Sequence, residues 1–161
     1  MLALLIFTTI KSFMKIQRDV MDKLCGVELS GSEAVIVLLE KVNEGYVFLS
    51  NESQKVKLGD DESSDDIKSF FETFQNFARQ HDVELVVIKK RPQKGKMAAG
   101  AVSFKMESLI QLNGVAEVTF VTGQGMAASE KKVSFNLPAG LRKYQEDAFK
   151  AAAFYIRKQG L

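Results

Sequence analysis

A run of basic side chains between positions 89 and 96 is the part of this sequence best suited to binding anions. It comprises Lys89, Lys90, Arg91, Lys94 and Lys96, with no acidic residue among them. Ammonium and guanidinium groups bind phosphate oxygens, and Gly95 lets the backbone approach such a ligand closely. Lys131 and Lys132 lie in a later segment that could fold over the same surface. We therefore interpret the run as a candidate phosphate or nucleic-acid site.

The same run also fits a solvated loop whose lysines pair with acidic residues elsewhere in the fold, Glu28 or Glu146 in particular. Stacking on nucleic-acid bases has little support, because it needs aromatic side chains and Phe104 alone lies near in the sequence. Both interpretations stay open at this point.

Composition limits the class of protein to which the chain can belong. It has 161 residues, of which 46% are apolar and 26% charged, as expected for one globular domain. A single cysteine and a single histidine exclude a disulfide framework, a thiolate metal cluster and a multi-histidine zinc site. No apolar run reaches the roughly 20 residues of a membrane-spanning helix. We expect a cytoplasmic protein without integral membrane association.

The formal net charge of +2 comes entirely from the first twenty residues. There Lys11, Lys15 and Arg18 outweigh Asp19, whereas residues 21–161 are neutral overall. We expect residues 1–20 to be an extension or tail that an alternative start site would omit. The alternative is a short amphipathic helix that docks on a membrane surface or a partner. The domain then spans residues 21–161.

Five segments have the apolar character and the flanking turns of strands. Residues 24–29, 33–39 and 46–50 are joined by short turns, which predicts an antiparallel meander. Residues 83–88 form a continuous apolar run of the kind found inside parallel sheets, and residues 117–121 predict a last strand.

Three segments have helical character. Phenylalanines at helical spacing over residues 67–78 predict an amphipathic helix, and a second helix is expected over residues 98–112. Residues 122–139 are expected to be a long loop, with at most a brief strand at 133–135, before a last helix over 140–157. The order β-β-β-α-β-α-β-α in one domain predicts an α/β fold with a mixed sheet and helices on both faces.

This order of elements resembles the ribonuclease H-like fold, whose five-stranded mixed sheet has the order 3-2-1-4-5. Three stretches are moreover similar to an uncharacterised bacterial family placed on the Holliday-junction-resolvase branch of that fold. They are CGVEL at residues 25–29, KGKMAAGAVSFKMESLIQL at 94–112 and YQEDAF at 144–149. The resemblance covers about residues 24–158.

The resemblance implies where catalytic acids would stand. In resolvases, carboxylates at the ends of the first and fourth strands and in the last helix hold divalent metals that cut nucleic acid. The matching positions here are Glu28, then Lys89 or Lys90, then Glu146 and Asp147. Adjacent helical residues point about 100° apart, so we do not expect Glu146 and Asp147 to face one ion. A lysine at the middle position opposes the charge of a metal, and its contact with a buried glutamate would leave a salt bridge in the metal's place.

We therefore expect a non-catalytic relative of these nucleases that needs no cofactor. It would bind DNA, RNA or phosphate through the loop at residues 89–96. A magnesium-dependent nuclease using Glu28, Glu146 and Asp147 is the first alternative. The second is an interaction module that forms a homodimer through its sheet edge or its last helix and binds no ligand.

Overall fold

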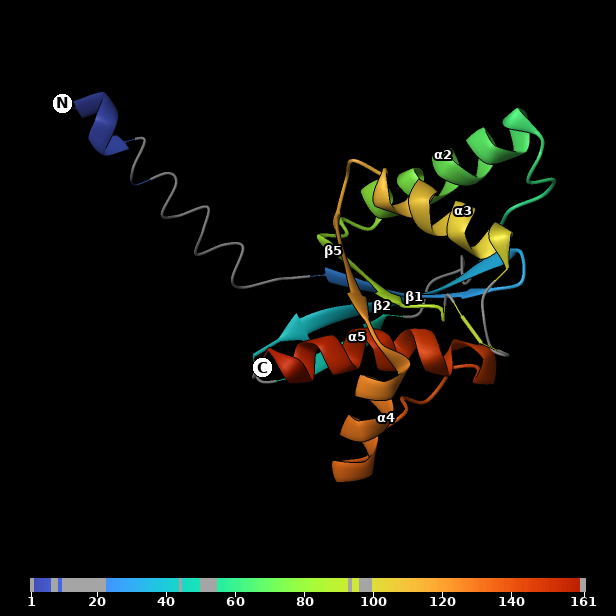
Figure 1. The fold of residues 1–161 in the computed structure, drawn as a ribbon. Helices are drawn as coiled ribbons and strands as arrows, with labels where there is room; N and C mark the ends of the chain where they lie inside the picture. Colours follow the sequence, from blue (N-terminus) through green and yellow to red (C-terminus); the bar gives the residue numbers. More distant parts are fainter. Residues whose placement is uncertain are drawn as a thin grey trace.

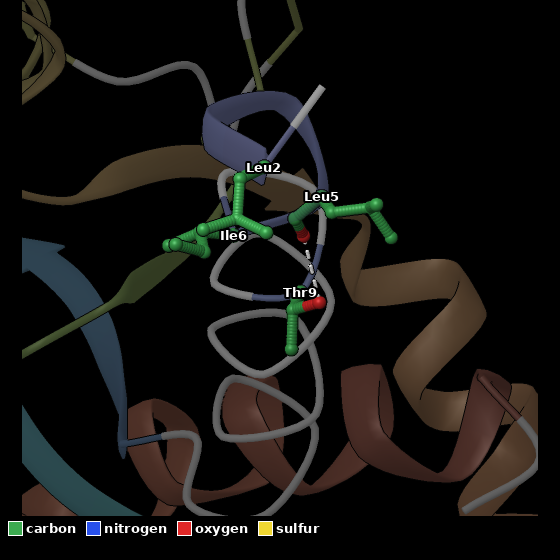
Figure 2. Close-up of a pocket in the computed structure, with 4 residues that line it drawn as sticks. All are labelled: Leu2, Leu5, Ile6 and Thr9. Atoms are coloured by element: carbon green, nitrogen blue, oxygen red, sulfur yellow. Dashed lines mark hydrogen bonds between the residues drawn. The ribbon is translucent and has the colours of Figure 1, made fainter.

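The computed structural model describes residues 2–6, 9, 23–43, 45–49, 55–92, 94–95 and 100–159. Lys96 and most of the segment 1–20 lie outside them, so the predictions for those residues stay untested. Residues 2–6 are helical, and the Thr9 hydroxyl donates to the Leu5 carbonyl at 2.8 Å. With Leu2 and Ile6, these two residues line a surface hollow (Figure 2). Within the described ranges, no helix combines the length and the apolar character needed to cross a membrane.

The first three strands form the predicted antiparallel meander. β1 (Lys23–Ser30) and β2 (Glu33–Val42) make a tight hairpin in which Gly31 takes the positive φ that its turn requires. β3 (Gly45–Leu49) pairs with β2 on its other side. A short strand that was not predicted, β4 (Lys55–Lys57), also pairs with β2.

β1 lies at the centre of the sheet because two later strands join it in parallel. β5 (Leu85–Lys89) pairs with β1, and β6 (Glu117–Val121) pairs with β5. The resulting order β3-β2-β1-β5-β6, with β4 beside β2, confirms the predicted mixed sheet and adds one strand to it.

Helices cover both faces of the sheet (Figure 1). α2 (Ser64–Gln80) and α3 (Ala101–Gln111) lie on one face, and the phenylalanines of α2 form the predicted buried stripe there. The Ser63 side chain accepts a hydrogen bond from the Asp66 amide and so caps α2. On the opposite face, α5 (Glu146–Lys158) packs its alanines, Phe149 and Ile156 against the sheet.

The segment between β6 and α5 differs from the prediction of a long loop. Its first part is a helix, α4 (Gly123–Lys132), in which the Thr122 hydroxyl caps the first turn by accepting from the Gly125 amide at 3.0 Å. The brief strand expected at 133–135 is absent, and residues 134–138 are irregular. α5 also begins later than predicted, at Glu146, after a single 3₁₀ turn, η1 (Lys143–Gln145).

Gly26 sets the distance between β1 and α5. A Cβ atom at this position would overlap the Ala148 carbonyl and lie 3.1 Å from the Ala152 Cβ. Only glycine therefore lets the first turn of α5 approach the middle of β1 so closely. This contact places Asp147, the neighbour of Ala148, beside the end of β1.

Candidate functional site

Glu28, Lys89 and Asp147 come together at one edge of the sheet, although they belong to three different elements. The parallel register pairs Val27 with Ile88, so the next residues along β1 and β5 are Glu28 and Lys89. Asp147 lies in the first turn of α5. The Lys89 Nζ lies 2.7 Å from the Asp147 Oδ2 and 4.0 Å from the Glu28 Oε1. Lys89 is thus the cation of a three-residue cluster.

The pKa values of the two carboxyl groups of this cluster are shifted in opposite directions. Burial raises the pKa of Glu28, and the Asp147 carboxylate raises it further, against the opposing effect of Lys89. Burial would also raise the pKa of Asp147, but the hydrogen bond from Lys89 and its charge outweigh burial and lower it. Asp147 is therefore the ionised partner of Lys89, whereas Glu28 retains its proton to a higher pH.

Two more cations surround the same carboxyl groups. Lys150, one turn after Asp147, lowers the pKa of Asp147 and forms an ion pair with Glu130 of α4 at 2.9 Å. Arg91 lies close enough to Glu28 to oppose the rise of its pKa. Lys150 and Arg91 thus add positive charge beside the two carboxyl groups of the cluster.

The donor set does not fit the pair of divalent metals that the fold implies. Among the described residues, no three acidic, cysteine or histidine side chains are arranged to hold one metal ion. Glu146 thus adds no third carboxylate to Glu28 and Asp147, although it shares the first turn of α5. Magnesium prefers six oxygen ligands in near-octahedral geometry, and here one of only two carboxylates is already bonded to an ammonium group.

A basic pocket of about 710 Å³ opens beside this cluster. It lies where β5 and β6 end, the edge at which ligands bind in open α/β sheets. Its lining consists of Lys89, Lys90, Arg91, Pro92, Lys94, Thr122, Gly123 and Gln124. Four of the five basic residues predicted in the run 89–96 therefore line one cavity.

Lys131 and Lys132 do not join this pocket. They lie in the last turn of α4, whereas Gly123 and Gln124 of the first turn line the cavity. Ten helical residues separate the two ends by about 15 Å. The prediction that these lysines extend the basic surface assumed a loop over the sheet edge, and the helix carries them away from it instead.

The amino terminus of α4 is the part of the site that the sequence analysis missed. Its first backbone N–H groups have no partners within the helix and carry the positive end of the helix dipole, which favours an anion. A Cβ on Gly123 would lie 3.6 Å from the Lys89 Cε, so the lysine stem passes beside this terminus. Within the described part of the chain, the buried Nε of Arg91, another residue of the pocket lining, has no hydrogen-bond partner.

Two contacts hold α4 in position against α5. One is the ion pair between Lys150 and Glu130. The other is Arg157, whose guanidinium donates to the Ser129 hydroxyl at 2.9 Å and to the Val133 carbonyl at 2.8 Å. The same guanidinium lies 4.0 Å from the centre of the Phe135 ring.

Comparisons with known proteins agree with this architecture. The sequence profile of a family described as "Protein of unknown function (DUF3010)" matches residues 22–155. RuvC of T. thermophilus, solved in complex with a Holliday junction substrate, is similar in structure with a TM-score of 0.58 at 13% identity; the match covers 85% of this chain and 96% of RuvC. The yeast mitochondrial Holliday junction resolvase Ydc2 has a TM-score of 0.60 at 6% identity, with 88% and 80% covered. Among curated proteins, none matches the sequence significantly. These likenesses confirm the resolvase-like ribonuclease H fold.

Proposed function

The chain belongs to the DUF3010 family of proteins of unknown function, and we propose that it binds nucleic acid through the basic pocket without cleaving it. The observation that carries the proposal is the position of this pocket. Lys90, Arg91 and Lys94 line it together with the first turn of α4, directly beside the ion pair between Lys89 and Asp147.

The pocket offers a phosphate group two kinds of donor. Lysine and arginine side chains supply charge, and the first amides of α4 supply oriented N–H groups. None of the described residues that line the pocket is aromatic, so we expect contacts with the phosphates rather than with stacked bases.

Structural relatives indicate which ligand to test first. RuvC of T. thermophilus, with the same fold, has been solved with a Holliday junction. A branched duplex is therefore the first probe, with linear duplex, single-stranded DNA and RNA beside it.

The experiment is a fluorescence anisotropy titration across a series of salt concentrations. Three phosphate contacts, from Lys90, Arg91 and Lys94, predict a slope of about −3 for the logarithm of affinity against the logarithm of salt. Arg91→Ala and Lys94→Ala should each weaken binding to all sequences and reduce the slope by about 1. Lys68→Ala is the matched control, because Lys68 is an exposed lysine of α2 on the opposite face of the sheet. Affinity that is insensitive to salt and to both pocket variants would contradict the proposal.

Divalent-metal-dependent cleavage is the competing function, and the proximity of Glu28 to Asp147 is the observation that favours it. Labelled junctions and duplexes incubated with Mg²⁺ or Mn²⁺ test it directly. We expect no cleavage. Cleavage that Glu28→Gln abolishes would assign a nuclease activity to the carboxylate pair and overturn the non-catalytic reading.

The predicted homodimer remains a separate expectation. Sedimentation of the protein with and without the junction measures it, and a monomer in both states would contradict it.

A further inference from the structure

We infer that Lys89 is a built-in counter-cation that takes the place of a divalent metal between Glu28 and Asp147. The chain would then hold its carboxylate pair together without any bound metal ion. This inference does not depend on nucleic-acid binding, because it concerns the protein alone.

The position of Lys89 is determined from three sides. Its backbone belongs to β5, which pairs with β1 on one side and β6 on the other. Its ammonium group donates to the Asp147 Oδ2 of α5 at 2.7 Å, and its stem runs past Gly123 of α4. Only 22% of its side chain is exposed. An ammonium group held in this way is part of the packed structure rather than a mobile surface charge.

The cluster already contains a cation beside its carboxyl groups. The Lys89 ammonium pairs with Asp147 and lies 4.0 Å from the Glu28 Oε1. A divalent ion entering beside Glu28 would meet the Lys89 ammonium within a few ångströms. At such a separation the like charges of a dication and an ammonium group repel each other strongly. Metal binding therefore requires that Lys89 leave the cluster.

The same geometry predicts what happens when the ammonium is replaced. Lys89→Glu puts a third carboxylate at the end of β5, between the ones that β1 and α5 already supply. Three oxygen-donor side chains that converge are a suitable set for Mn²⁺ or Mg²⁺. The substitution should therefore create a divalent-cation site that the wild-type protein lacks.

The experiment compares Mn²⁺ binding by calorimetry and thermal unfolding with Mn²⁺ or EDTA. The wild-type protein should show no stoichiometric binding and the same Tm in both conditions. Lys89→Glu should bind one Mn²⁺, and its Tm should rise by roughly 3–6 °C when free Mn²⁺ is ten times Kd. Lys158→Glu is the control, since it makes the same charge change at an exposed residue of α5 that lies about 16 Å along the helix from Asp147.

Two results would overturn the inference. One is stoichiometric Mn²⁺ binding by the wild-type protein that Glu28→Gln or Asp147→Asn removes. The other is a folded Lys89→Glu variant that binds Mn²⁺ no more tightly than Lys158→Glu. If Lys89→Glu does not fold, Lys89→Gln replaces it, because it removes the ammonium and keeps an oxygen donor. Lys89→Gln must then bind Mn²⁺ more tightly than the wild-type protein, or the inference is wrong.

Discussion

Replacing Gly26 with alanine should destabilise the domain and separate the residues of the Lys89 cluster. The added Cβ would overlap the Ala148 carbonyl, which is backbone and cannot rotate away as a side chain can. α5 must therefore move from β1 by roughly 1.5 Å to restore ordinary van der Waals contact. The same movement carries Asp147 away from Glu28 and Lys89.

The expected loss of stability follows from this overlap. Adding a methyl group to a packed core costs about 1–3 kcal/mol, and the upper value applies because the obstructing atoms are backbone. The alanine also restricts the unfolded chain, which returns about 0.7 kcal/mol. The net loss of about 2 kcal/mol corresponds to a fall in Tm of roughly 4–8 °C for a domain of this size.

Thermal unfolding followed by circular dichroism measures this loss. Gly45→Ala is the matched control, because a Cβ at Gly45 meets no atom within 4 Å. Its Tm should stay the same or rise by about 2 °C. If Gly26→Ala had the same Tm as Gly45→Ala, the close approach of α5 to β1 would be refuted.

Three further substitutions test other contacts. Because the pKa of Glu28 is raised in the folded protein, ionisation of this group lowers the stability of the fold as pH rises. Glu28→Gln should therefore have a higher Tm than the wild-type protein at pH 7–8. In a series of Tm measurements at different pH, this difference should vanish below about pH 4, where Glu28 is protonated in both states. Arg157→Gln should cost about 1–3 kcal/mol and speed amide hydrogen exchange in residues 133–137, because it frees the Val133 carbonyl. Asn113→Ala should cost about 3 kcal/mol in urea unfolding, since its fully buried side chain bonds four backbone groups of the turn before β6.

Each of these predictions has an outcome that would contradict it. A constant difference between Glu28→Gln and the wild-type protein across the pH series would mean that Glu28 does not titrate with folding. Unchanged exchange in Arg157→Gln would show that the guanidinium does not hold the segment after α4. Wild-type stability of Asn113→Ala would mean that other groups or water satisfy the turn.

The sheet and three of its covering helices, α2, α3 and α5, could be predicted because their signals are local. Short turns join β1, β2 and β3, and the phenylalanines of α2 repeat at helical spacing. α4 could not be predicted in this way, since Gly123 and Gly125 weaken its first turn. It is helical because Thr122 caps it and because contacts with α5 hold its far end.

The site was predictable in part, because its basic residues are also close together in the sequence. Four basic residues of one run share the pocket because a single strand end carries them. The contribution of the α4 amino terminus depended on a helix that the sequence did not reveal. The approach of Asp147 to Glu28 depends on how α5 packs over Gly26, which is a tertiary contact without a sequence period.

The central position of β1 also determines when this site comes into existence during synthesis. β2 follows β1 directly in the sequence, whereas long segments separate β5 and α5 from β1. The contact between the Gln145 side-chain amide and the Ile36 carbonyl, for example, joins residues 109 positions apart. At 5–20 residues per second, a ribosome needs on the order of ten seconds to add the chain between β1 and α5. During that interval the apolar face around Gly26 has no helix to cover it. A nascent chain therefore exposes this apolar face until α5 emerges and covers it.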